Sequence, residues 1–102
     1  MKKKVIIIGS GIAGLAVSIR LKSKGYSVEV YEKNKNVGGK LSDFYIDKFR
    51  HDFGPKLFTM PNLIEDIFEN AGVKTDKYFK YDKLDIACKY FWDDGQIFNA
   101  YS

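Results

Sequence analysis

The chain has 102 residues, of which 45% are apolar and 16% aromatic, and its net charge is +4. This composition supports a folded core and argues against intrinsic disorder. The positive charge comes from an N-terminal lysine run and from basic residues scattered among acids, so nothing indicates nucleic-acid binding. The single cysteine, Cys88, excludes an internal disulfide framework and is typical of a reducing compartment. His51 is the only histidine, so we expect no zinc site built from His and Cys ligands.

The N-terminus superficially resembles a secretory signal peptide, because MKKK precedes an apolar run that ends at Arg20. The run is too short and too interrupted by glycine for a membrane span. A strand–helix–strand pattern begins inside it and is completed after residue 25. We therefore expect this segment to be retained and folded.

Three elements are predicted in the first third of the chain. Residues 5–8 (VIII) are a β-branched apolar run, which predicts a strand buried on both faces of a parallel sheet. Residues 12–24 have the apolar spacing of a helix, and Gly25 occupies the position where glycine ends a helix. Residues 26–31 (YSVEVY) predict a second strand, parallel to the first through a right-handed crossover.

The rest of the chain predicts a loop, a second helix and two hairpins. KNKNVGGK is a polar loop, and SDFYIDKFRHDFGP predicts two short strands around residues 47–48. Pro61 opens a helix that Gly72 ends. From Tyr78 the pattern is that of a strand, and LDIACKYFW and QIFNAYS form a hairpin around residues 93–95. All aromatic residues lie from Tyr26 onward, which favours strand packing in a core over a surface for a large apolar substrate.

The stretch GSGIAG, between the first strand and the helix, is typical of a dinucleotide-binding turn. Gly9 permits the sharp turn, Gly11 lets a pyrophosphate approach the backbone, and Gly14 allows close packing of helix and sheet. The backbone N–H groups around Ser10, Ile12 and Ala13 would face the phosphates at the helix N-terminus. A glycine-rich turn without a ligand is the alternative.

Glu32 ends the second strand, where a carboxylate can accept both ribose hydroxyls of an adenosine. The same charge would repel a 2′-phosphate, so an NADP-type ligand is disfavoured. The alternative is an ordinary solvated acid at a strand end. Together with the glycine motif, Glu32 predicts a dinucleotide site.

The segment VEVYEKNKNVGGK resembles the extended FAD-binding signature of the amine-oxidase and phytoene-desaturase superfamily. The matching positions are Gly9, Gly11, Gly14, Ser18, Glu32, Lys33, Gly38, Gly39 and Lys40. The resemblance implies FAD as the cofactor, with the second glycine pair close to it and Lys40 near it. A loose turn is the alternative for the glycine pair.

The segment FRHDFGPKLFTMP resembles the bacterial carotenoid-desaturase branch of this superfamily. The matches are Phe49, Arg50, Asp52, Gly54, Pro55 and the stretch Phe58-Thr59-Met60-Pro61, whereas His51 and Phe53 depart from the usual residues. The resemblance places Gly54 and Pro55 near the flavin, with a purely structural turn as the alternative. It implies removal of a hydride and a proton from adjacent carbons of a lipophilic carotenoid. It supplies no catalytic residue, so we expect Cys88 in a buried strand and His51 in a structural or cofactor-proximal role.

The implied fold is α/β, the N-terminal part of a Rossmann-like FAD-binding fold followed by the start of an antiparallel β substrate-binding domain. Residues 1–72 would form the FAD-binding segment with its loop and helix, and residues 73–102 the first substrate-domain hairpin, both incomplete. Because family members are several times longer, we expect a fragment that lacks activity and binds FAD weakly or not at all without the C-terminal part of the same enzyme. The resemblance also implies a cytoplasmic location with peripheral contact to the cytoplasmic membrane. The alternatives are another flavoprotein of the superfamily, such as a carotenoid isomerase or amine oxidase, or a non-catalytic remnant.

Overall fold

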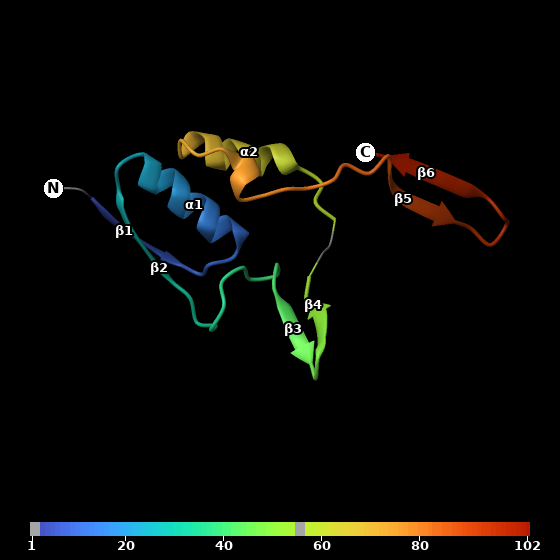
Figure 1. Cartoon of the computed structure of the whole chain (residues 1–102), viewed down its shortest axis with the longest axis horizontal. Coiled ribbons are helices and arrows are strands. Elements are labelled where there is room, and N and C mark those ends of the chain that lie inside the picture. Colours follow the sequence, from blue (N-terminus) through green and yellow to red (C-terminus); the bar gives the residue numbers. More distant parts are fainter. Residues whose placement is uncertain (1–2, 55–56) are drawn as a thin grey trace.

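The chain begins with a strand–helix–strand unit, seen in the computed structural model, which describes residues 3–54 and 57–102. Its elements are β1 (Lys4–Ile8), α1 (Ile12–Ser23) and β2 (Ser27–Tyr31). The two strands are parallel, with Lys4 opposite Ser27 and Ile8 opposite Tyr31. Helix α1 forms the connection and lies along one side of the strand pair (Figure 1). The predicted unit is therefore confirmed.

Helix α1 ends at Ser23, and Gly25 follows its C-cap residue, Lys24, in the position that the sequence predicts. Gly25 has φ +88°, a left-handed conformation that glycine adopts without the cost of a Cβ. Its N–H donates to the Lys22 carbonyl at 3.0 Å, and the Tyr26 N–H donates to the Leu21 carbonyl at 3.1 Å. This pair of bonds is the Schellman motif, which satisfies carbonyl groups of the last turn and directs the chain into β2.

Two antiparallel hairpins follow, each forming a separate two-stranded sheet. The first contains β3 (Asp43–Ile46) and β4 (Phe49–Asp52), and the second contains β5 (Ile86–Phe91) and β6 (Ile97–Tyr101). Between them lie α2 (Pro61–Asn70) and the short 3-10 helix η1 (Thr75–Lys77). The predicted hairpins and the predicted second helix are confirmed. Figure 1 shows α2 beside α1, with the β5–β6 hairpin extending away from the helices.

The strand predicted from Tyr78 is wrong in its first part, because residues 78–85 contain no strand and β5 begins at Ile86. The aromatic side chains of this segment contact α2 and the residues before it. Tyr78 stacks on Phe68 with ring centroids 5.7 Å apart, and Phe79 meets Phe58 edge-on at 5.5 Å. These contacts hold the segment along α2, where no described strand lies beside it to form the backbone hydrogen bonds of a sheet.

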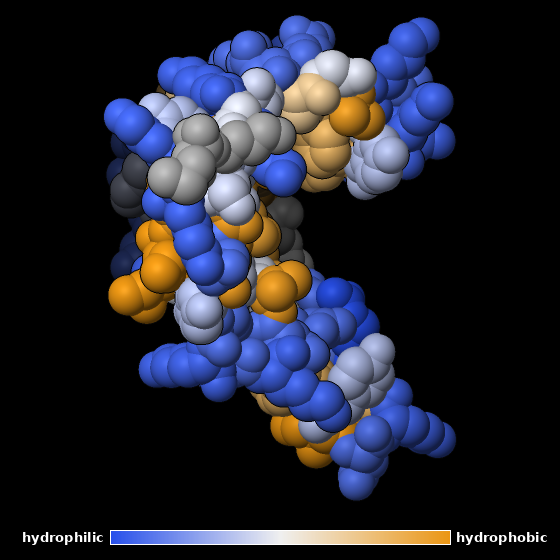
Figure 2. All heavy atoms as spheres, turned by 90° about the vertical axis from the view of Figure 1, so that its left-hand side faces the viewer, coloured by the Kyte–Doolittle hydropathy of each residue, from blue (hydrophilic) through white to orange (hydrophobic). Residues whose placement is uncertain are grey.

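The described residues form a small and divided core. Among the apolar side chains of residues 3–54 and 57–102, only Ile67 is buried, at 6% exposure. The radius of gyration is 18.2 Å, against about 13 Å for a compact domain of this length. Figure 2 shows apolar side chains in separate surface patches, with a hollow between the upper and lower parts of the molecule.

Strand β1 illustrates this division. Ile7 faces α1, since its Cγ2 would lie 3.5 Å from a Cβ added at Gly14. Side chains alternate along a strand, so Ile6 and Ile8 point to the opposite face, where they are 57% and 90% exposed. The prediction that this strand is buried on both faces is therefore wrong for the described residues, because α1 covers one face and no described segment covers the other.

Candidate functional site

The sequence GSGIAG forms the turn between β1 and α1. Gly9 has φ +96°, where a side chain would be strained, and its N–H donates to the Tyr31 carbonyl of β2 at 2.7 Å. A Cβ added at Gly14 would overlap the Gly9 carbonyl oxygen. The first glycine thus turns the chain sharply off β1, and the last lets the first turn of α1 lie directly against that turn.

Gly11 is the N-cap of α1 and leaves open space beside the helix N-terminus. Its φ is −66° and its ψ 174°, and no side chain of the described residues caps the helix there. A Cβ added at Gly11 would meet no described heavy atom within 4 Å. The N–H groups of the first turn, including those of Ile12 and Ala13, lie at the positive end of the helix dipole. This combination fits a phosphate group.

The second glycine pair lies against this first loop. The Gly38 N–H donates to the Ser10 carbonyl at 2.9 Å, and Gly38 forms an isolated parallel bridge with Gly11. A Cβ added at Gly39 would lie 3.0 Å from the Gly11 Cα. Both glycines have positive φ, +116° and +61°. The two glycine motifs that the sequence singled out are therefore adjacent in space.

Glu32 faces the glycine loop from the end of β2. Its Oε2 accepts hydrogen bonds from the backbone N–H and the hydroxyl of Ser10, both at 2.8 Å. Its Oε1 accepts from the backbone N–H and the side-chain amide of Asn34, both at 2.9 Å. These bonds, led by the Ser10 N–H, lower the pKa of Glu32 from its ordinary 4.5 to about 2. A negative charge therefore stands beside the loop at neutral pH.

The remaining predicted residues lie in the loops around this centre. A Cβ added at Gly54 would overlap the Lys40 carbonyl oxygen, so the end of the β3–β4 hairpin lies against the residue that follows the glycine pair. Lys40 and Gly54 line an open groove of about 450 Å³ that also includes Arg50. Lys33 is exposed beside Glu32, and Pro55 lies outside the described residues.

Sequence reasoning missed the side chains of Ser10 and Asn34 as partners of Glu32. The prediction that the Ser10 N–H faces the phosphates is wrong, because this N–H donates to Glu32 Oε2. The available signals were a hydroxyl inside the glycine turn and an amide two residues after the strand-end acid. The sequence left a structural and a cofactor-proximal role open for His51. In the structure its ring stacks on Phe44, with ring centroids 5.4 Å apart. Cys88 is half-buried in β5 opposite Ala100.

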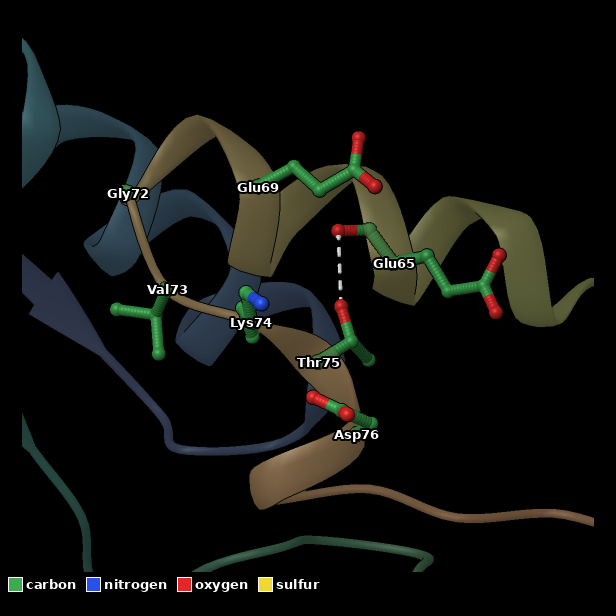
Figure 3. Close-up of a pocket in the computed structure, with 7 residues that line it drawn as sticks. All are labelled: Glu65, Glu69, Gly72, Val73, Lys74, Thr75 and Asp76. Carbon is green, nitrogen blue, oxygen red and sulfur yellow. Dashed lines mark hydrogen bonds between the residues drawn. The ribbon is translucent and has the colours of Figure 1, made fainter.

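A larger groove, of about 570 Å³, lies between α2 and η1 and is distinct from the glycine loops (Figure 3). Its lining includes Glu65, Glu69, Lys74 and Asp76, and the Thr75 hydroxyl donates to the Glu65 carbonyl at 3.5 Å.

The described residues contain no group of three or more His, Cys, Asp or Glu side chains placed to hold a metal ion. They also contain no helix with the length and apolar character that a bilayer crossing needs. The candidate site is formed by the two glycine loops and Glu32, which meet at the N-terminus of α1.

A parallel strand–helix–strand unit, a glycine turn with an open helix N-terminus and a facing carboxylate together define a dinucleotide-binding domain. Residues 7–71 match the family described as NAD(P)-binding Rossmann-like domain, and the chain belongs to that family.

Among curated proteins, the chain is 52% identical over 99 residues to 1-hydroxycarotenoid 3,4-desaturase of Flavobacterium sp. (strain P99-3). It is 39% identical over 95 residues to 4,4'-diapolycopene oxygenase of Methylomonas sp. and 33% identical over 100 residues to 4,4'-diaponeurosporene oxygenase of Staphylococcus haemolyticus (strain JCSC1435). These matches cover 96%, 93% and 98% of the chain, and 20%, 19% and 20% of the three relatives. The chain thus spans about a fifth of their length, and the resemblance drawn from FRHDFGPKLFTMP is confirmed.

Proposed function

We propose that the chain is the N-terminal, dinucleotide-binding part of an FAD-dependent carotenoid desaturase. The observation that carries this proposal is the 52% identity to 1-hydroxycarotenoid 3,4-desaturase, which extends over 96% of the chain. The aligned region extends over nearly the whole chain, so it includes the glycine turn, Glu32, the glycine pair and the β3–β4 segment together. The domain family alone would support only a dinucleotide ligand of unspecified kind.

The arrangement of the loops supports FAD as that ligand. The N–H groups of Ile12 and Ala13 would bind the pyrophosphate in the space beside Gly11, and Glu32 would accept the ribose hydroxyls. Its charge disfavours a ligand that carries a 2′-phosphate. The glycine pair, lying against Gly11, is the element in which the FAD signature differs from that of an ordinary NAD dehydrogenase. Lys40 and Gly54, which contact each other beside the glycine pair, complete the proposed site.

In the proposed reaction, a carotenoid loses a hydride and a proton from neighbouring carbons and gains a double bond. When bound, FAD supplies the two-electron acceptor for the hydride. This chain contributes binding and orientation through the glycine turn and Glu32. We assign no catalytic residue, since His51 is stacked in the β3–β4 hairpin and Cys88 is half-buried in β5.

The organisation of the chain follows from the same proposal. Residues 1–72 hold the dinucleotide, and residues 73–102 begin a domain that binds the lipophilic substrate. The exposed Ile6 and Ile8 support a larger protein in which further segments cover β1. We place this protein in the cytoplasm with peripheral contact to the membrane, where a carotenoid resides. The exposed aromatic side chains of β5–β6, such as Phe91 and Trp92, are consistent with apolar contacts of that kind.

Oxygenation of a carotenoid is the second candidate, because two of the relatives are named as oxygenases. Product analysis separates the two reactions. The full-length protein is purified, and any bound nucleotide is released and identified by its absorbance and chromatography. The protein is then incubated with a 1-hydroxycarotenoid and an electron acceptor, with the 102-residue chain as the comparison.

Desaturation predicts a product that lacks two hydrogen atoms, with a longer conjugated system and red-shifted absorbance, whereas oxygenation predicts a gain of oxygen. We expect FAD with the full-length protein and no turnover by the 102-residue chain alone. A protein that carries NADP in place of flavin would refute the proposal, as would turnover by the short chain alone.

A further inference from the structure

The carboxylate of Glu32 has no spare acceptor position in the structure. A carboxylate offers about four lone-pair positions, two on each oxygen. The N–H and hydroxyl of Ser10 occupy Oε2, and the N–H and amide of Asn34 occupy Oε1, at 2.8 to 2.9 Å. A ribose brings hydroxyl donors of its own. At least one of the four protein donors must therefore leave when a ribose binds.

The four donors differ in how freely they can leave. Ser10 is 1% exposed, and its carbonyl also accepts the Gly38 N–H, so it is fixed between the two glycine motifs. The N–H of Asn34 is part of the main chain. The side-chain amide of Asn34 belongs to an exposed residue and moves by rotation about two bonds. The amide is thus the donor that a ribose hydroxyl can replace at the smallest cost.

We propose that Ser10 and Asn34 are positioning residues for ribose recognition, with Ser10 as a permanent anchor of Glu32 and the Asn34 amide as a placeholder that a ribose hydroxyl replaces. This inference rests on the proposed dinucleotide site and deepens it. Ser10 keeps the carboxylate in one orientation before the ligand arrives, which reduces the ordering cost of binding. Neither residue needs to touch the reacting part of the ligand.

The two residues predict opposite effects on the binding of ADP, which contains the adenosine and diphosphate without the rest of a dinucleotide. The Asn34→Ala variant of the full chain removes the competitor for Oε1, so we expect about three-fold tighter binding. Asn36→Ala, in the same exposed loop, is the matched control and should bind ADP like the unmodified chain. Chemical-shift titration by NMR measures these affinities even where binding is weak.

The Ser10→Ala variant frees the carboxylate to rotate, so we expect about ten-fold weaker ADP binding. We also expect a smaller preference for ADP over 2′-deoxy-ADP, a change that a merely structural role of Ser10 would not produce. Ser23→Ala, whose hydroxyl bonds the Arg20 carbonyl at the far end of α1, is the matched control. If Ser10→Ala fails to fold, the ADP titration of Asn34→Ala, which changes an exposed side chain, tests the proposal.

The results test two claims, the placeholder role of the Asn34 amide and the dinucleotide site itself. Tighter binding by Asn34→Ala supports the placeholder. Weaker or unchanged binding by that variant, while the unmodified chain binds ADP, overturns the placeholder and leaves the dinucleotide site in place. Absence of ADP binding to the full-length protein freed of its nucleotide overturns both.

Discussion

Replacing Gly11 by alanine separates the binding role of the glycine turn from its structural role. Gly11 has φ −66° and ψ 174°, which alanine adopts without strain, and an added Cβ would meet no described heavy atom within 4 Å. The substitution should therefore leave the free energy of unfolding unchanged or raise it by about 0.4 to 1 kcal/mol, since alanine restricts the unfolded chain. The new methyl group would stand in the space that the phosphates need.

Forcing a methyl group into a close contact costs about 1 to 3 kcal/mol. That cost corresponds to a loss of roughly 5- to 150-fold in affinity. Urea denaturation followed by circular dichroism measures the stability, and NMR titration with ADP measures the affinity. Gly14→Ala is the contrasting variant, because its Cβ would overlap the Gly9 carbonyl and destabilise the fold itself. The reasoning is refuted if Gly11→Ala binds ADP normally, or if it loses as much stability as Gly14→Ala.

Three further predictions concern stability. The pKa of Glu32 is about 2 in the folded chain, against 4.5 ordinarily. Its ionised form therefore stabilises the fold above about pH 4.5, and this contribution is lost as the pH falls towards 2. The difference in unfolding free energy between the unmodified chain and Glu32→Gln should shrink over that range, and a difference independent of pH would contradict the assignment. Gly25→Ala should destabilise the chain by about 1 kcal/mol in urea denaturation, because its φ is +88°; an unchanged midpoint would argue against the Schellman motif. Arg50 pairs with Asp43 and Asp52 at exposed positions, so Arg50→Ala should lower the urea midpoint slightly at low salt and less at high salt. A loss of stability that is insensitive to salt would show that the pairs are not its cause.

The sequence predicts the local structure well because local rules determine it. Gly25 follows α1 in a left-handed conformation that favours glycine, and Gly72 follows α2 in the same way. Pro61 begins α2, where its fixed φ suits the first helical position and its missing N–H is not needed. The β3–β4 hairpin turns at Asp47, which has φ +53° and is of a residue type that tolerates this conformation. The adjacency of the two glycine motifs was predictable only through the resemblance to a known signature.

Features that depend on distant segments were not predictable from local patterns. Residues 78–85 have strand-like composition, but Tyr78 and Phe79 are held against Phe68 and Phe58, which no local pattern reveals. The exposure of Ile8 depends on which segments cover β1, whereas its sequence alone is that of a fully buried strand. The hydrogen bonds from Ser10 and Asn34 to Glu32 likewise require the end of β2 to lie beside the glycine turn.

The identity of the nucleotide that co-purifies with the full-length protein tests the central claim most directly. Denaturation releases the ligand, and chromatography with absorbance spectra distinguishes FAD, NAD and NADP. The glycine pair against Gly11 and the charged Glu32 predict FAD in about equimolar amount, and a smaller amount of FAD with a Gly11→Ala protein. Recovery of NADP, or of NAD without flavin, would contradict the account.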